Sequence, residues 1–516
     1  MQTPGDPEAA EHGSSFPEAH RPEREILDLE RALDALRDEF VAAPNTALAY
    51  MQSERARSLY RGVRHAAAGP SGAECYVVAR ALVEVALVAA WVAKDPRKRL
   101  VSWQAHSADE EVKLSRALAA IDDESKSLLN EPAYLERQRL ASGPKMPDLA
   151  SVAKDVGPEA VTFYSVFYRT LSSWTHATNL SFQDSVVETG TALEITEAGL
   201  SRDHALSLRQ QAAMTYAYAM ESLCGWAHDL NGTAGVRAHA TQLKEICGSL
   251  RGSADAEDPV GLQNHETTVL LRKTLARVPA LRVRGQAITL SAENNPGSLA
   301  ELDQRDPQGR YVCELAQGAI GVAGDHLESW RRLIEAETQP GFSHMTLLRA
   351  VLEGSSFARW LLDPTATSAQ RIQRGVAAQL ADYEERRKWE VASGIDSVPR
   401  SGNARSGRQR RDDVTRARNA GGVTEIRVLP FVELCKNYAI GGTFGGEGLY
   451  RLASGFAHSK QWVLLLSEHK LHPELKLPTG AIASQVTADD PISAAVTSLA
   501  VKTFTAAVVD LERYVR

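Results

Sequence analysis

An arginine and a histidine recur at one fixed spacing in two similar stretches of this sequence. The first stretch is YRTLSSWTHA, residues 168–177, and the second is YRLASGFAHS, residues 450–459. If each stretch is helical, residues seven apart differ by about 20° around the axis, so the two side chains share one stripe. A guanidinium can hold a phosphate and an imidazole can transfer a proton near neutral pH, which is ribonuclease chemistry.

The paired residues are therefore the candidate catalytic groups, namely Arg169 with His176 and Arg451 with His458. Polar side chains of the same two stretches are candidate supporting residues. These residues are Tyr168, Ser172, Tyr450 and Ser454. A helical stripe of this composition is also typical of polar contacts between packed helices, so a structural role stays open.

A second charged pair occurs twice at a spacing of four residues. Arg80 precedes Glu84 in a very apolar segment, and Arg349 precedes Glu353 in a similar one. One interpretation is a local Arg–Glu ion pair along each helix. The functional alternative is that each glutamate orients the arginine or histidine of the facing stretch.

No metal or cofactor motif accompanies these residues. The sequence has no HExxH, paired CxxC or repeated ExxH motif, and no glycine-rich phosphate loop before a helix. The five cysteines are scattered and odd in number, which favours a reducing compartment. We therefore expect a cytoplasmic protein with no metal and no cofactor.

Targeting and membrane signals are also not expected. The N-terminus is acidic and rich in Pro and Gly, and it lacks the basic start and apolar core of a secretory signal. The apolar run VALVAAWVA, residues 85–93, has about half of the ~18 residues that a bilayer-spanning helix needs. We predict no membrane partner.

Composition places the chain among ordinary globular proteins. It has 516 residues, of which 43% are hydrophobic and 24% charged, with a formal net charge of −7. This charge gives no global attraction for a polyanion, so nucleic-acid contacts must come from local patches. The evident patch is the Arg-rich stretch 400–418, and its candidate contact residues are Arg405, Arg408, Arg410 and Arg411. A solvated charged loop is the alternative.

The two stretches belong to a longer repeat with four blocks in the same order. RALVEVALVAAWVAKDP (80–96) matches RAVLEGSSFARWLLDP (349–364), with Arg, Glu and Trp each 269 residues apart. Three later blocks, the last containing the Arg/His stretches, recur at offsets of 273 to 283 residues. Ordered blocks at a nearly constant offset indicate two diverged copies of one domain.

The repeat sets the predicted domain boundaries. We expect a disordered tail at 1–22, one copy at 23–245, a linker at 246–264 and a second copy at 265–516. The second copy should contain a mobile Arg-rich loop at 393–422, because no periodicity survives there.

Apolar residues recur at three- and four-residue spacings in the long segments of both copies. The predicted class is mostly α, with two homologous helical bundles. Few short strands are expected, and the candidates are SVVETGTALEIT (185–196) and LRVRGQAITL (281–290).

The order of RALVE, Trp, Asp-Pro and YRTLSSWTHA resembles an uncharacterised family of bacterial helical domains and, more distantly, the HEPN superfamily. HEPN proteins are helical bundles with an Arg and a His in a short motif, and many are metal-independent ribonucleases that act as toxins or phage-defence effectors. Their active site usually forms where two HEPN domains meet. The resemblance marks Arg169 with His176, and Arg451 with His458, and it implies a pseudo-dimer within one chain.

This sequence departs from the HEPN pattern after the arginine. Active HEPN nucleases tend to have Asn, Asp or His there, whereas this chain has Thr170 and Leu452. Because Thr170 is closer to the expected type, we predict that His176 contributes more to activity than His458.

The resemblance implies a metal-independent endoribonuclease, or a defence or stress effector that binds RNA or a nucleotide. Two other classes stay open. The first is a non-catalytic helical scaffold or sensor, and the second is a biosynthetic enzyme with an apolar helical pocket. A homodimer of the whole chain is a further possibility.

Overall fold

The computed structural model of this chain is mostly helical, as predicted. It describes residues 44–68, 75–119, 132–169, 171–172, 186–189, 192–195, 202–231, 265–288, 295–335, 343–392, 405–441, 445–458 and 491–516. The expected tail at 1–22 and linker at 246–264 lie outside the described residues. We refer to the described residues up to 231 as the first half and to those from 265 as the second half.

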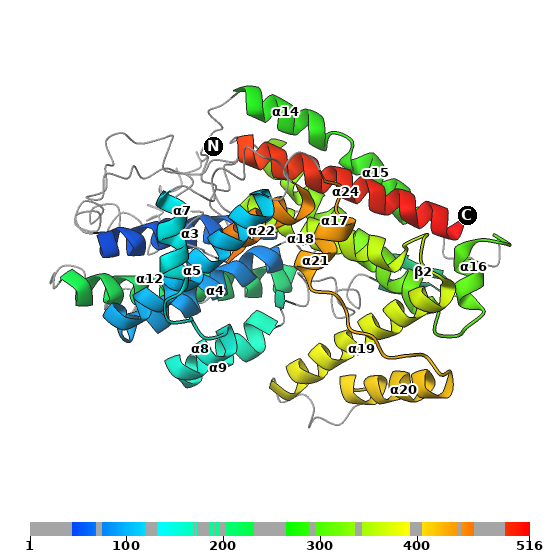
Figure 1. Ribbon diagram of the computed structural model, residues 1–516, viewed down its shortest axis with the longest axis horizontal. Coiled ribbons are helices and arrows are strands. Elements are labelled where there is room, and N and C mark those ends of the chain that lie inside the picture. The colour runs from blue at the N-terminus through cyan, green and yellow to red at the C-terminus, as the bar shows by residue number, and fades with distance from the viewer. Residues whose placement is uncertain are drawn as a thin grey trace, which may run out of the picture.

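The first half consists of helices and one short hairpin (Figure 1). Its elements are α3 (Pro44–Ala68), α4 (Cys75–Ala93), α5 (Pro96–Ala119), α7 (Pro132–Ala141), α8 (Leu149–Val156), α9 (Pro158–Thr162), the π-helix η3 (Phe163–Tyr168), β1 (Val186–Thr189), β2 (Ala192–Ile195) and α12 (Arg202–Asn231). The strands pair antiparallel, with Val186 opposite Ile195, so the hairpin predicted at 185–196 is confirmed.

The described elements of the second half are all helical. They are α14 (His265–Leu275), α15 (Val278–Gln286), α16 (Leu299–Gln304), α17 (Arg310–Glu335), α18 (Ser343–Leu361), α19 (Ser368–Ala392), α20 (Gly407–Ala420), α21 (Phe431–Tyr438), α22 (Gly445–Ala457) and α24 (Pro491–Val515).

Helix α4 is apolar on every side because other helices surround it. It packs against α3, α12, α8 and η3, and every residue from Val77 to Val92 is buried. Its only charged residues are Arg80 and Glu84. Two charges inside so apolar a helix need polar partners from neighbouring elements, since burying an unpaired charge is costly.

Helix α18 is a buried helix of the second half. It packs against α17, α24, α21 and α22, and it carries Arg349 and Glu353. Helices α4 and α18 also contact each other near the middle of the molecule (Figure 1). Glu84 of α4 acts electrostatically on Arg349 of α18.

The halves are joined by reciprocal contacts. Helix α22 of the second half packs on α5 of the first, and η3 of the first half contacts α19 of the second. Helices α3 and α18 also approach closely, because a Cβ on Gly62 would stand only 2.8 Å from Cβ of Ser343. Buried apolar side chains of both halves form one continuous cluster.

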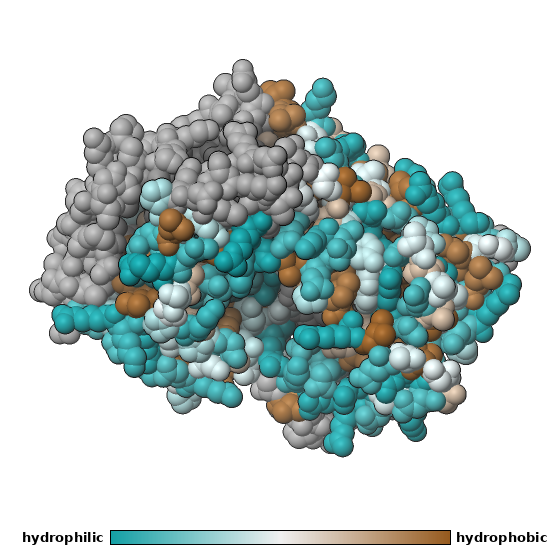
Figure 2. Space-filling model, viewed as in Figure 1, coloured by the Kyte–Doolittle hydropathy of each residue, from teal (hydrophilic) through white to brown (hydrophobic). Residues whose placement is uncertain are grey.

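The two longest apolar helices deserve comparison with membrane spans. Within the described residues, α4 and Ile492–Val515 of α24 have the length and composition to cross a membrane, which is weak evidence by itself. Most of each apolar window, 83% in α4 and 61% in α24, is buried inside the protein. The outer face shown in Figure 2 is mostly hydrophilic, with scattered hydrophobic residues.

Two local predictions were wrong. Residues 281–286 of the expected strand 281–290 belong to α15, where Leu281 is buried and Val283 is 64% exposed, so the alternating pattern does not mark a buried face. The expected loop at 393–422 contains helix α20. Ser406 and Gln409 form a capping box that satisfies its first N–H groups, and Arg is a good helix former. Residues 393–404 lie outside the described residues.

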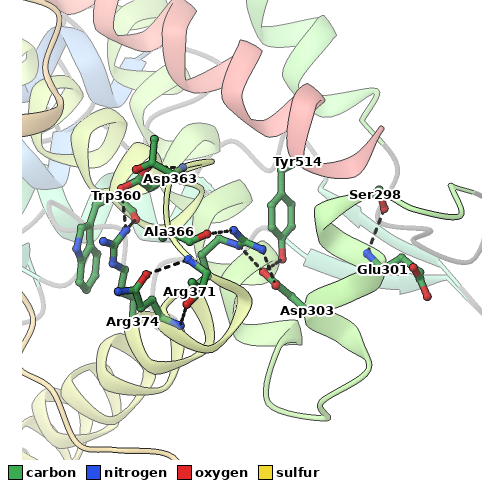
Figure 3. Close-up of polar contacts among 12 residues, drawn as sticks. Ser298, Glu301, Asp303, Trp360, Asp363, Ala366, Arg371, Arg374 and Tyr514 are labelled. Carbon is green, nitrogen blue, oxygen red and sulfur yellow. Dashed lines mark hydrogen bonds and ion pairs between the residues drawn. The ribbon is translucent and has the colours of Figure 1, made fainter.

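A buried ion pair fixes the C-terminal helix to the rest of the second half (Figure 3). Arg371 of α19 donates from Nε and Nη2 to the two carboxylate oxygens of Asp303 in α16, at 2.7 and 2.8 Å. The hydroxyl of Tyr514, near the end of α24, donates to the same carboxylate at 2.9 Å. Arg371 and Asp303 are 2% and 0% exposed, and three elements meet at this carboxylate.

Candidate functional site

The described parts of the two Arg/His stretches are helical, as predicted. Tyr168 is the last residue of η3, and Arg169 and Ser172 continue in helical conformation. His176 lies outside the described residues. In the second stretch α22 ends at Ala457, and the next residue, His458, donates its backbone N–H to Ser454 O at 2.8 Å.

The π-helix η3 places Tyr168 next to α4. It widens the helical turn over Phe163–Tyr168, directly before Arg169. Short π-helical segments are rare and occur often at functional sites. Helix η3 contacts α4, α8 and α19, so it lies where the two halves meet.

His458 reaches across to the first half. Its Nδ1 lies 2.7 Å from Oε1 and 2.8 Å from Oε2 of Glu84, which is 374 residues away in sequence. The glutamate therefore has a histidine partner from the other half, whereas His176, the histidine of the facing stretch in its own half, lies outside the described residues. The His458 side chain is 21% exposed and that of Glu84 is 11% exposed.

Arg80 does not form the expected ion pair with Glu84. Its Nη2 instead donates to the Tyr168 hydroxyl at 2.9 Å, and its guanidinium carbon lies 5.0 Å from the centre of the Tyr168 ring. The local Arg–Glu interpretation is wrong in this half. The physical reason is that Glu84 turns towards His458, while an aromatic ring covers the guanidinium.

The local ion pair does form in the second half. Arg349 Nε donates to Glu353 Oε1 at 2.9 Å, and the Tyr450 hydroxyl donates to the same oxygen at 2.9 Å. The side chains of Arg349 and Glu353 are 6% and 0% exposed. Each half therefore brings a tyrosine from the Arg/His stretch to the charged residues of its central helix.

The two arginines of the stretches lie near acidic residues of the opposite half. Arg169 Nη1 lies 4.0 Å from Glu385 of α19, and Arg451 Nη1 lies 3.8 Å from Glu110 of α5. Arg451 also donates from Nε to Glu447 at 2.9 Å within α22. Arg451 in α22 and His458 directly after it thus contact different helices of the first half, α5 and α4.

Burial sets the protonation of this cluster. It lowers the pKa of His458 to about 4, against the opposing effect of Glu84. Burial raises the pKa of Tyr168. At neutral pH the imidazole is therefore neutral and the phenol is protonated. The carboxylate beside Nδ1 selects the tautomer with the proton on Nδ1, which leaves the lone pair on Nε2.

Two further residues of the cluster were missed from the sequence. Arg55 of α3 is fully buried, and its pKa falls to about 9 through desolvation, opposed by Glu84. His326 of α17 is 2% exposed, and burial lowers its pKa to about 4, opposed by Glu353.

A sequence signal for both residues exists. Arg55 and His326 are 271 residues apart, inside the range of the repeat offsets and their drift. The surrounding segments ERARSLYR (54–61) and DHLESWRR (325–332) share an acidic residue, a serine and an arginine at that offset.

The arginines of the predicted nucleic-acid patch lie on or next to α20 and are partly neutralised. Arg405 pairs with Asp413, and Arg411 Nε lies 3.4 Å from Glu384 of α19. Arg410 hydrogen-bonds the side chain of Tyr383. Arg408 is exposed, and no ion pair of Arg408 is seen within the described residues. The structure therefore separates one solvent-facing arginine from three that contact their own protein.

The cluster has the groups for proton transfer and anion binding. It combines a neutral imidazole, two carboxylates, two phenols and several guanidiniums, from both halves. In the part of the chain that the structure describes, no three His, Cys, Asp or Glu side chains gather as metal ligands.

The fold and this cluster define a mostly helical protein with a buried charged site built from both of its halves. Residues 52–192 match a family of unknown function, DUF5677. The matched segment includes Arg80, Glu84, Tyr168 and Arg169. No curated protein and no solved structure matches the chain.

Proposed function

We propose that this protein is an HEPN-like cytoplasmic protein that binds RNA or a nucleotide and cleaves RNA without a metal, as a defence or stress effector. The observation that carries this proposal is the contact between His458 and Glu84, beside the guanidinium of Arg80. A neutral imidazole held by a carboxylate through Nδ1 can accept a proton at Nε2. An adjacent arginine can stabilise the charge that develops on a phosphate.

The same contact supports an origin by internal duplication. A pair of HEPN-like domains would place the histidine of one domain against the other, and here the second half supplies His458 to the first. The reciprocal contacts of α5 with α22 and of α19 with η3 fit a pseudo-two-fold pairing within one chain. We infer that 23–245 and 265–516 are the two copies.

A non-catalytic scaffold is the second candidate. The buried Arg349–Glu353–Tyr450 network supports it, because such a network can fix the packing of helices without touching a ligand. The partial exposure of His458 and its distant partner favour the first proposal, since a histidine sealed beneath apolar side chains with local partners would suit a scaffold.

The test is cleavage of labelled single-stranded RNA by the purified protein with EDTA present. His176→Ala, His458→Ala and the double variant are compared with the wild type, and circular dichroism checks that each variant folds. Loss of an acid/base group should reduce cleavage ~10²-fold or more. Equal cleavage by wild type and double variant would assign the activity to another site or a contaminant. A wild type that cleaves no RNA, with both variants less stable on melting, would support the scaffold.

A further inference from the structure

Among the described residues, the hydrogen-bond partner of the buried Arg80 side chain is a neutral group. Arg80 lies in the second turn of α4 and is 7% exposed. Its Nη2 donates to the Tyr168 hydroxyl, while its Nε is buried and has no hydrogen-bond acceptor. None of the carboxylates in the described ranges forms an ion pair with it.

Two other buried arginines of the second half have carboxylate partners. Arg371 is held by both oxygens of Asp303 (Figure 3), and Arg349 by Glu353. A guanidinium stays protonated in proteins, and a buried charge without a counter-charge is costly. The contrast of Arg80 with Arg371 and Arg349 is therefore a reason to look for an anion that is not part of the chain.

The surroundings of Arg80 are suited to such an anion. The Tyr168 hydroxyl accepts from Arg80 and keeps its own proton, so it can donate to an oxyanion. The next turn of α4 holds Glu84 with His458, and Arg349 adds a further positive charge to the cluster. Of the two arginines that the motif marked, Arg451 donates to Glu447, and Arg169 has an acidic neighbour, Glu385, at 4.0 Å.

We propose that Arg80, with the Tyr168 hydroxyl, is the ligand for a phosphate group in this protein, in place of Arg169 and Arg451. The planar fork of the guanidinium and the phenolic proton together match the oxygens of a phosphate monoester or diester. The proposal rests on the proposed function in one respect: if RNA is the substrate, the bound group is the phosphodiester next to His458.

The test uses inorganic phosphate as the probe on the full chain. Binding is measured by calorimetry and by the shift in melting temperature, with chloride at equal ionic strength as the reference. The variants are Arg80→Met, Arg80→Lys and the control Arg374→Met. Arg374 is a similar guanidinium, stacked on Trp360, but it donates to Asp363 and to a backbone carbonyl.

We expect phosphate to stabilise the wild type and Arg374→Met alike, and Arg80→Met to bind it ~10-fold more weakly or not at all. In phosphate-free buffer Arg80→Met should melt no lower than the wild type, because it removes an unpaired buried charge, whereas Arg374→Met should melt lower. Arg80→Lys keeps the positive charge but lacks the planar guanidinium, so its affinity for phosphate should lie between those of the wild type and Arg80→Met.

Several results would overturn the assignment. The first is that the wild type does not bind phosphate. The second is that Arg80→Met binds phosphate with an affinity within about twofold of the wild type. The third is that Arg80→Met, in phosphate-free buffer, loses as much stability as Arg374→Met. If Arg80→Met fails to fold, wild-type affinity in Arg80→Lys would overturn it. If the wild type binds phosphate through Arg80 but does not cleave RNA, the proposed ribonuclease function is wrong and Arg80 stays the phosphate ligand. If RNA cleavage is unchanged in Arg80→Lys, the ribonuclease function stands and Arg80 is not its phosphate ligand.

Discussion

Nδ1 of His458 lies 2.7 Å from Oε1 of Glu84, and this contact joins the end of α22 to the middle of α4 across 374 residues of sequence. The carboxylate fixes the orientation and tautomer of the ring. The imidazole in turn gives the Glu84 charge a hydrogen-bond donor inside the most apolar helix of the first half. The proposed acid/base role of His458 and the packing of the two halves therefore depend on the same contact.

The first prediction concerns that coupling. In a double-mutant cycle of Glu84→Ala and His458→Ala, we expect a coupling free energy of ~0.5–3 kcal/mol, because each residue is a partner of the other. Urea unfolding followed by circular dichroism measures it. The matched control combines Glu84→Ala with His326→Ala, which faces the other glutamate. Additive effects at Glu84 and His458, within about 0.5 kcal/mol, would mean that the contact is not made in solution.

The second prediction is a loss of stability towards acid pH. Burial lowers the pKa values of His458 and His326 to about 4, below the usual value of about 6.5. Between these values the unfolded chain binds protons that the folded chain does not, so stability falls as the pH falls. The slope should be at most ~1.4 kcal/mol per pH unit for each histidine.

Urea unfolding at a series of pH values between about 7 and about 5 tests this slope, since the histidines titrate there in the unfolded chain. Glu84, Arg80 and Arg349 act on the charge of His458, and Glu353 on that of His326. His458→Gln and His326→Gln should each flatten the profile. An unchanged slope in both variants would assign the acid sensitivity to other groups.

The third prediction concerns the buried ion pair between Arg371 and Asp303, which also binds Tyr514 of α24. Asp303→Asn should lower the free energy of unfolding by ~3–5 kcal/mol, because it leaves Arg371 as an uncompensated buried charge. Tyr514→Phe removes one hydrogen bond and should cost ~1–2 kcal/mol. Thermal and urea unfolding measure both effects.

Two controls distinguish the charge from the packing at this site. The double variant Asp303→Leu with Arg371→Met removes both charges and should recover much of the loss. Glu301→Gln, which breaks an ion pair with Arg305 on the surface of the same helix, should have little effect. A double variant as unstable as Asp303→Asn would show that shape, not charge, dominates here.

The fourth prediction concerns the arginines of α20 as RNA contacts. Arg408→Gln should weaken the binding of single-stranded RNA and reduce the salt dependence by ~0.7 in the slope of log K against log salt. Arg411→Gln should weaken RNA binding less, because Arg411 already pairs with Glu384, and it should lower the free energy of unfolding by at most ~1 kcal/mol. Filter binding at several salt concentrations and melting curves measure the two effects. RNA binding that is unaffected by Arg408→Gln would exclude this face of α20.

The mostly helical class was predictable because it depends on local periodicity. The amphipathic spacing of apolar residues and the turn residues around 185–196 act over a few neighbours, and the hairpin forms where predicted. The α15 and α20 segments were missed for a local reason as well. An alternating apolar pattern does not show which face is buried, and a dense run of arginines hides a capping box at Ser406.

The candidate residues were also found in sequence, but their partners were not. The repeat singled out Glu84, Tyr168, Arg349, Tyr450 and His458, and all of these meet near the contact of α4 with α18. The spacing of four residues predicted an Arg–Glu ion pair in both halves, and it forms only between Arg349 and Glu353. The spacing in sequence shows which side chains can meet along one helix. It does not show whether a side chain of another helix lies nearer to one of them.

The sequence by itself determined the helices, the repeated polar residues and the kind of chemistry that they can perform. Only the tertiary structure decided that His458 binds Glu84 of the other half, that Arg80 turns to Tyr168, and that Arg169 and Arg451 face opposite acidic helices. The physical reason is that a buried charge takes the partner that packing brings within hydrogen-bond distance, and the packing of two halves is a long-range property of the chain.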